Sequence, residues 1–346
     1  MNLKELADAL GLSQTTVSRA LNGYPEVSEG TRARVLNAAR SFNYRPSTGA
    51  RNLATGRSMA MRHIVPLSAR HDMMNVIFSE FMSGTGEVYA EHGYDMIVSF
   101  VPKDKELQAY RDAVARGSVD GFMIHGPTRD DPRLPLLAEL GVPFVVHGRS
   151  TGYNVPYAWL DVNNRRAIER ATTYLIGLGH RRIGLVNGPE HMDFALRRRE
   201  GYLTALASAG ITADDALMTA GDLTEPQGYN AAQRMLGLSN PPTAFVASAI
   251  LPTLGIRRAV EGRKLEVGRD ISVICYDDKV STLPNGDTAE PMFTAARSSV
   301  RDAGRRCAEI LIDCINNPHL PLRQELWEAE LILGGSTAVA KKEPTR

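Results

Sequence analysis

The sequence predicts an all-α amino-terminal headpiece followed by an α/β domain of two lobes, each a doubly wound parallel sheet. Up to residue 46 apolar residues recur at helical spacing, whereas from residue 62 short apolar strands alternate with amphipathic helices. Alternating βα units are typical of parallel sheets, and two such runs of similar length indicate two like-folded lobes with a cleft between them. A chain of 346 residues has room for two or three compact units.

The composition is that of an ordinary globular protein, with 43% hydrophobic and 23% charged residues. No apolar run is long enough to span a membrane, and an amphipathic start that carries Glu5 and Asp8 differs from a signal peptide. The three cysteines form no zinc-binding pair, so neither a metal nor a cofactor is expected. These features favour a reduced, cytoplasmic setting.

Two short helices joined by a glycine turn are predicted at the start of the chain. Gly11 supplies the turn, because glycine takes positive φ without steric cost, and Ser13 caps the second helix. The apolar residues of these helices share one face: Leu3, Leu6, Ala7 and Leu10, then Val17, Ala20 and Leu21. The outward residues of the second helix are polar and of the kind that reads base edges in a major groove: Gln14, Thr15, Ser18 and Arg19. The segment predicts a helix-turn-helix, although by itself it also fits a small helical bundle.

A third helix follows, with Ser28 as its cap. Its predicted inner face holds Val35, Leu36, Ala39 and Phe42, and its outer face holds Arg32, Arg34 and Arg40. Over residues 1–58 eight basic residues stand against four acidic ones, while the whole chain has a net charge of +1. Positive charge is therefore concentrated where it would neutralise DNA phosphates.

Strands are predicted near residues 63–67, 94–101, 119–125 and 143–147, and in the second run near 183–187, 217–221, 244–248 and 271–276. Between and after them, helices are predicted over 76–92, 163–178 and 299–316. Residues 47–58 are small and polar and bounded by glycine, which by itself indicates a linker.

Four segments together resemble the LacI/GalR family of bacterial repressors: LSQTTVSRALNG (12–23), VSEGTRARV (27–35), YRP (44–46) and ARNLATG (50–56). The likeness continues through nearly the whole chain. Within the family, the opening residues resemble regulators of α-glucoside uptake.

The resemblance implies a headpiece at 1–46, a hinge helix at 47–60, an effector-binding and dimerisation domain at 61–340 and a tail at 341–346. The large domain would have the periplasmic-binding-protein-like fold, with lobe 1 at about 61–160 and 291–320 and lobe 2 at about 161–290 and 321–340. Chain crossings between lobes are then expected near 159–163, 285–295 and 318–325. The tail is expected to be disordered.

The resemblance also implies a homodimer on a pseudo-palindromic operator in double-stranded DNA. Leu53 matches the leucine that wedges into the minor groove at the centre of the site. The implied DNA-binding residues are Ser13, Gln14, Thr15, Thr16, Ser18, Arg19, Asn22, Tyr44, Arg51, Leu53 and Ala54.

Polar residues follow the predicted strands, at the edge where open parallel sheets bind ligands. Arg198 stands three residues before Gly201, where the family places its effector-binding arginine, and Asp277 matches an aspartate that faces the ligand. The implied effector-binding residues are Asp72, His125, His147, Arg149, Arg198 and Asp277. Structural roles remain open for them: Arg198 lies in a run of three arginines, Asp277 can be a cap or pair with Arg198, and the histidines can simply end their strands.

Three positions depart from the family pattern. Ala249-Ile250 replaces a polar pair, Leu223 stands where many sugar-responsive members have an aromatic ring, and Gly334-Gly335 replaces Arg-Glu. The first two bear on which effector binds.

The predicted function is that of a transcriptional repressor controlled by a small effector, a sugar or α-glucoside. The spacing of phosphate-binding glycine loops is absent, as are GxSxG and HExxH, so no enzyme activity is predicted. The alternatives are the same fold responding to a purine or another co-repressor, and a sugar-binding protein without a regulatory role.

Overall fold

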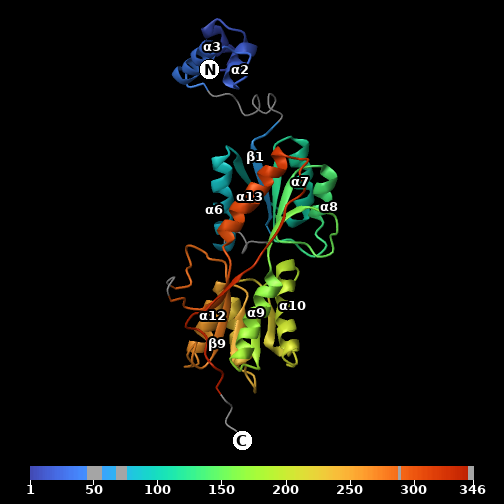
Figure 1. The fold of residues 1–346 in the computed structure, drawn as a ribbon, viewed down its shortest axis with the longest axis vertical. Coiled ribbons are helices and arrows are strands. Elements are labelled where there is room, and N and C mark those ends of the chain that lie inside the picture. The colour runs from blue at the N-terminus through green and yellow to red at the C-terminus, as the bar shows by residue number, and fades with distance from the viewer. Residues whose placement is uncertain (45–56, 68–75, 287–289, 342–346) are drawn as a thin grey trace. The chain divides into compact units, whose positions relative to one another are not determined.

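The computed structural model describes residues 1–44, 57–67, 76–286 and 290–341. The chain divides into two compact units, Met1–Met59 and Ala60–Arg346, drawn in Figure 1.

In residues 1–44 the first unit forms three helices: α1 (Leu3–Leu10), α2 (Gln14–Leu21) and α3 (Glu29–Ser41). Asn2 and Glu5 form a capping box at the start of α1, and Gly11 ends it with a φ of 63°. The core is formed by side chains from all three helices and from the segment between α2 and α3: Leu6, Ala7, Val17, Ala20, Val27, Val35 and Ala39.

The predicted inner face of α3 is wrong at two positions. Leu36 is 37% exposed and Phe42 is 49% exposed. The buried stripe of α3 is narrower, with Val35 and Ala39 one turn apart, and the helix ends at Ser41. Phe42 therefore lies beyond the last helical turn that packs on the core.

Lobe 1 of the second unit is built on a parallel sheet with strand order β11-β5-β4-β3-β1-β2. Its strands are β1 (Ala60–Pro66), β2 (Asp95–Val101), β3 (Gly121–His125), β4 (Phe144–His147), β5 (Ala158–Val162) and β11 (Gln324–Trp327). Figure 1 shows α6 and α13 on one side and α7 and α8 on the other. These helices are α6 (Val76–Glu91), α7 (Glu106–Ala115), α8 (Arg133–Leu140) and α13 (Val300–Asn316), with a short 3-10 helix at Lys103–Lys105.

Lobe 2 repeats this architecture with strand order β12-β10-β9-β8-β6-β7, in which only β12 runs antiparallel to its neighbour. Its strands are β6 (Ile183–Asn187), β7 (Met218–Ala220), β8 (Ala244–Ala247), β9 (Ser272–Asp277), β10 (Thr294–Arg297) and β12 (Glu330–Ile332). Helices α9 (Asn164–Gly177) and α10 (Asp193–Ser208) form one apolar core with the sheet, and α11 (Glu225–Leu236) and α12 (Ile250–Glu261) form another. A 3-10 helix at Asp215–Leu217 precedes β7.

The chain crosses between the lobes three times: after β5, between β10 and α13, and between β11 and β12. The expected limits of the lobes need two corrections. Residues 294–297 belong to the sheet of lobe 2 rather than lobe 1, and residues 324–327 belong to the sheet of lobe 1 rather than lobe 2. Both are four-residue strands, and pairing with other strands assigns them to a sheet (β9 and β12 for β10, β5 for β11), which no local pattern reveals.

At the carboxyl end of the chain, Lys341 pairs with Asp270, so this first residue of the expected tail is tied to lobe 2. Residues 342–346 lie outside the described part. Across the described ranges, no helix is long and apolar enough to cross a membrane.

Candidate functional site

The polar side chains of α2 and its two caps form two groups. Some make hydrogen bonds to the helix backbone, and the others make none and can contact a ligand. Ser13 Oγ accepts a hydrogen bond from the backbone N–H of Thr16 (3.1 Å), and Asn22 Nδ2 donates to the carbonyl of Ser18 (2.9 Å). Gln14, Thr15 and Arg19 are exposed and make no side-chain hydrogen bond within the described residues. The available donors and acceptors therefore lie on the outer face of α2.

Two arginines of α3 support the headpiece instead of extending freely. Arg32 donates to the carbonyl of Tyr24 (2.7 Å), and Arg34 donates to that of Leu10 (3.3 Å). Tyr44 packs half-buried against the headpiece core, and this burial raises the pKa of its hydroxyl. The predicted DNA-binding residues Arg51, Leu53 and Ala54 lie outside the described residues.

In lobe 2, Arg198 of α10 is buried, with 6% of its surface exposed. Its guanidinium carbon lies 3.7 Å from the ring centre of Tyr276, and its Nε donates to Oδ1 of Asn164 (2.8 Å). A further hydrogen bond runs from its Nη1 to the carbonyl of Ser248. Its neighbours Arg197 and Arg199 form separate ion pairs with carboxylates of lobe 2, so the three arginines do not form one solvated face.

Two adjacent carboxylates end β9 and have different surroundings. Asp277 accepts from Nε of Arg297 (2.9 Å) and from the backbone N–H of Lys279 (2.8 Å), so its partner is not Arg198. Burial raises the pKa of Asp278 to about 7, against the opposing effect of the Arg198 charge. Asp278 was not among the predicted effector-binding residues, although it stands beside Asp277 in the same motif.

In lobe 1, the two predicted histidines belong to a cluster with a third that was not predicted. His63 Nδ1 lies 2.8 Å from His125 Nε2, and the His147 ring stacks on Phe81 with centroids 4.4 Å apart. Burial lowers the pKa of His63 to about 3 and that of His147 to about 4, and it lowers that of His125 as well. All three rings are therefore neutral at pH 7. The sequence signal that could have identified His63 is its place in a predicted strand, β1, which pairs with β3, the strand of His125.

Arg149 lies just beyond the end of β4 and pairs with a buried carboxylate. Its Nε donates to Oδ2 of Asp161 (2.8 Å), and its guanidinium carbon lies 5.0 Å from the ring centre of Trp159. Asp161 also accepts from Asn164, the first residue of α9 (3.3 Å). Asp161 and Asn164 were both missed, because strand β5 was not predicted. Asp72 lies outside the described residues.

The departures from the family pattern occupy apolar or tightly packed surroundings. Ala249 and Ile250 are buried, and Ile250 belongs to an apolar cluster of lobe 2. Phe194 and Leu223 both border Gly188, so an aromatic ring lies beside the leucine that replaces one. A Cβ atom at Gly334 would lie 2.4 Å from the carbonyl oxygen of Pro291, so no larger residue fits there without a shift.

The side-chain contacts that join the lobes include those of two carboxylates, Asp193 and Glu80. The carboxylate of Asp193 in lobe 2 accepts from the backbone N–H and the hydroxyl of Thr151 in lobe 1. The carboxylate of Glu80 in lobe 1 accepts from the backbone N–H (3.0 Å) and the hydroxyl (2.7 Å) of Ser281 in lobe 2. Both carboxylates are buried.

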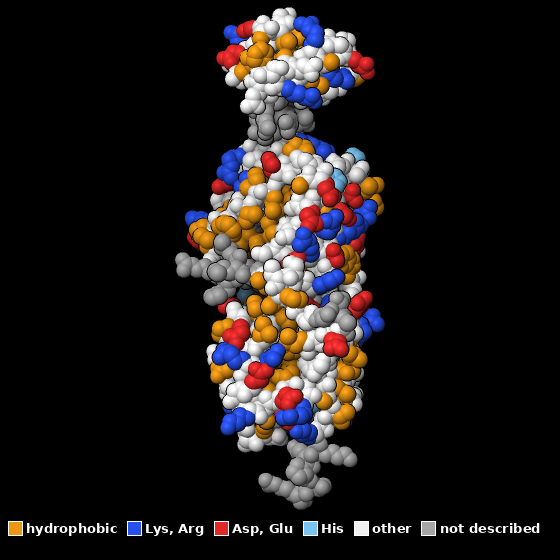
Figure 2. Space-filling view, turned by 90° about the vertical axis from the view of Figure 1, so that its left-hand side faces the viewer, with side chains coloured by type: hydrophobic (Ala, Val, Ile, Leu, Met, Phe, Trp, Pro, Cys, Tyr) orange, Lys and Arg blue, Asp and Glu red, His pale blue; other side chains and the backbone are white. Residues whose placement is uncertain are grey.

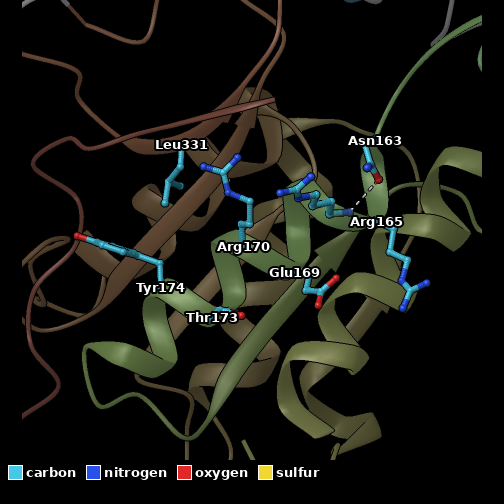
Figure 3. A pocket seen from close by; sticks show the side chains of 8 residues that line it. Asn163, Arg165, Glu169, Arg170, Thr173, Tyr174 and Leu331 are labelled. Carbon is cyan, nitrogen blue, oxygen red and sulfur yellow. Dashed lines mark hydrogen bonds between the residues drawn. The ribbon is translucent and has the colours of Figure 1, made fainter. Parts of the chain in front are cut away.

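A separate open groove runs along α9, with a volume of about 550 Å³. Figure 3 shows Arg170 and Tyr174 on α9 pointing toward the side of Leu331. Two of the three arginines that line it already have partners: Arg166 lies 3.4 Å from Glu328, and Arg170 donates to the carbonyl of Ala329 (3.1 Å). None of the predicted effector-binding residues lines this groove.

Comparisons with known proteins match both units. The family described as bacterial regulatory proteins, lacI family, matches residues 2–47, and the family described as periplasmic binding proteins and sugar binding domain of LacI family matches residues 70–325. The HTH-type transcriptional regulator AglR of Rhizobium meliloti (strain 1021) is 44% identical over 340 residues, which are 98% of this chain and 95% of that protein. The HTH-type transcriptional regulator RafR of Escherichia coli is 32% identical over 341 residues, which are 97% of this chain and 98% of that protein.

Among solved structures, the transcriptional regulator CelR–cellobiose complex aligns with a TM-score of 0.71 and 28% identity, covering 97% of this chain and 99% of that one. The lac repressor dimer bound to operator and the anti-inducer ONPF aligns with a TM-score of 0.82 and 24% identity, covering 98% of this chain and 99% of that one, which supports the fold. The predicted fold class is confirmed: a helix-turn-helix headpiece with a two-lobed periplasmic-binding-protein-like domain. The chain belongs to the LacI family and is a DNA-binding transcriptional regulator, not an enzyme.

Proposed function

We propose that this chain is a repressor whose affinity for operator DNA is controlled by a sugar, an α-glucoside, bound between the two lobes. The observation that carries the proposal is the fixed position of Arg198. Asn164, Ser248 and Tyr276 hold its guanidinium group, while its Nη2 has no hydrogen-bond partner among the described residues. A pre-positioned guanidinium edge of this kind suits a pair of sugar hydroxyls.

The other proposed contacts come from both lobes: His125, His147 and Arg149 from lobe 1, and Asp277 and Asp278 from lobe 2, with Asp72 added by the family pattern. Neutral histidines can both donate to and accept from hydroxyl groups, which suits an uncharged, polyhydroxylated ligand. The CelR structure holds cellobiose, which supports a glucose-containing ligand here. The apolar pair Ala249-Ile250 favours a larger or less polar glycoside.

For DNA binding we propose a homodimer that places two α2 helices in successive major grooves, with Gln14, Thr15 and Arg19 toward the bases. Ser13, Thr16, Ser18, Asn22 and Tyr44 would contact the backbone or hold the helix, and the hinge residues Arg51, Leu53 and Ala54 would enter the minor groove. Such a regulator works in the cytoplasm, where the chromosome is.

The proposed dimer is supported by apolar side chains on the surface of the second unit. Met96 and Phe100 of the edge strand β2 are 38% and 46% exposed. Figure 2 shows apolar side chains interspersed with charged ones over both lobes. The lac repressor, with the same fold, binds its operator as a dimer.

Thermal unfolding of the purified protein against maltose, other mono- and disaccharides and purines tests the effector class. A ligand at 100 times its dissociation constant adds about 2.7 kcal/mol to the free energy of unfolding, which raises the midpoint visibly. We expect the shift with α-glucosides. A shift with purines alone would contradict the proposal.

Arg198→Ala then tests the site. The variant should bind operator DNA with unchanged affinity but should no longer be released by the sugar, because the headpiece is intact and the hydroxyl clamp is lost. Arg199→Ala is the matched control, since Arg199 is half-exposed and lies 3.6 Å from Glu190. Normal release of Arg198→Ala by the sugar would refute the assignment.

A further inference from the structure

The two arginines of the proposed effector site are joined by a continuous series of hydrogen bonds. Arg149 donates to the Asp161 carboxylate (2.8 Å), Asn164 donates to the other oxygen of that carboxylate (3.3 Å), and Arg198 donates to the side-chain oxygen of Asn164 (2.8 Å). Asp161 lies near the end of β5 and Asn164 begins α9. The middle of the series is therefore the segment in which the backbone leaves lobe 1 and enters lobe 2.

The series lies out of contact with water over most of its length. Asp161 and Asn164 are each 4% exposed and Arg198 is 6% exposed. A buried donor or acceptor that loses its partner is costly, so the three bonds favour one relative position of the two guanidinium groups. The nearby carboxylate of Asp193 is held by Thr151 and Arg197 and does not replace Asp161.

We infer that Asp161 and Asn164 are positioning residues that couple the two arginines, so that a ligand held by one guanidinium group sets the place of the other. The inference rests on the proposed function, because it adds residues to the same site. Rotation of the lobes changes backbone angles at the crossover, and hence the distance between the side chains of residues 161 and 164. A ligand that engages both arginines at this spacing favours the lobe arrangement in which the series is intact.

A double-mutant cycle with Arg149→Lys and Asn164→Ala tests the coupling, with maltose as the probe and its dissociation constant as the readout. Each single change should weaken binding by about 10-fold, the usual size for a hydrogen bond to a charged group. Because the hydrogen bonds act in series, breaking one removes the effect of breaking the other. The double variant should therefore have about the same dissociation constant for maltose as the single variant that binds maltose less tightly. Two effects that multiply to about 100-fold would overturn the inference.

Asn163→Ala is the matched control at the same crossover. Asn163 caps α9 by accepting from the N–H of Arg166 (3.2 Å) and donates to Glu328 (2.8 Å), but it contacts neither Arg149 nor Arg198. In a double variant with Arg149→Lys, the effect of Asn163→Ala on the dissociation constant should multiply with that of Arg149→Lys.

The wild type, Arg149→Lys, Asn164→Ala and the double variant are also compared without sugar. The readout is the equilibrium constant of unfolding, extrapolated from urea denaturation. A coupled series gives a double variant less destabilised than the product of the single effects predicts. If maltose and the other sugars do not bind the wild type, the effector proposal fails while this measurement still decides the coupling. Multiplicative effects on unfolding would reject the coupling whatever the sugar result.

Discussion

Among single residues, burial shifts the pKa values in opposite directions on the lobe 1 and lobe 2 sides of the proposed site. In lobe 1 it disfavours the charged form of the histidines and lowers their pKa values, to about 4 for His147. In lobe 2 it disfavours the charged form of Asp278 and raises its pKa to about 7. Both shifts favour the neutral form: His147 is neutral at pH 7, and Asp278 is about half protonated there.

The histidine cluster predicts a loss of stability in acid. The folded pKa of His147, about 4, lies below the value of about 6.5 for the unfolded chain, so its contribution is fully present above pH 6.5 and is lost as the pH falls toward 4. His147→Gln should reduce the difference in the free energy of unfolding between pH 7.5 and 5 by about 2 kcal/mol. Urea unfolding at both pH values measures it, and an unchanged difference would show that the ring is not buried as described.

Asp278 predicts a pH dependence of stability of the opposite sign. Its folded pKa of about 7 lies above the unfolded value of about 4, so this group lowers stability progressively as the pH rises from 4 to 7. Asp278→Asn should therefore be more stable than wild type at pH 8, by up to about 4 kcal/mol, and similar to it near pH 4. The matched change Asp277→Asn should lower stability at pH 8, because Arg297 loses its partner. Urea unfolding of both variants distinguishes them.

Among helices and strands, the sequence predicted those that are marked by a continuous apolar pattern of their own. Helix α6 and strand β6 match their predicted ranges closely, because each is a continuous run with its own apolar periodicity. Strands β5, β10, β11 and β12 were not predicted, since they are short and are stabilised by distant pairing. These strands flank the crossovers, so the lobe limits and the residues near the first crossover could not be read from local pattern.

The packing of α9 on α10 depends on Gly201. A Cβ atom there would lie 2.1 Å from the carbonyl oxygen of Arg165, so Gly201→Ala must push the two helices apart and displace Arg198 one turn away. We expect a loss of about 2–4 kcal/mol, in the range of strained core substitutions. Gly177→Ala at the end of α9 meets no atom within 4 Å and should be neutral or stabilising by about 1 kcal/mol. Thermal unfolding compares the two, and equal effects would contradict the close approach of the helices.

At the scale of the whole second unit, function depends on contacts that no sequence pattern contains. The resemblance identified the arginine and the aspartate of lobe 2, but it did not show that Asp277 pairs with Arg297 or that Asp193 pairs with Thr151. The first pair depends on the register of β9 and β10 within lobe 2, and the second depends on how the two lobes meet in three dimensions. Buried contacts between the lobes oppose their separation, and a ligand must favour one lobe arrangement by a few kcal/mol to switch the regulator.

The contact between Asp193 and Thr151 should limit how often the lobes separate. The Asp193 carboxylate is 1% exposed and also accepts from Nε of Arg197 (2.5 Å), so Asp193→Asn leaves Arg197 without its ion pair and weakens the link between the lobes. Hydrogen exchange at the amide of Thr151 should become at least about 10-fold faster, while amides in the middle of both sheets keep their protection. Asp214→Asn is the control, because Asp214 pairs with Arg182 inside lobe 2 and is 38% exposed. Equal exchange in wild type and Asp193→Asn would mean that the lobes are held by other contacts, with Glu80 and Ser281 the next pair to test.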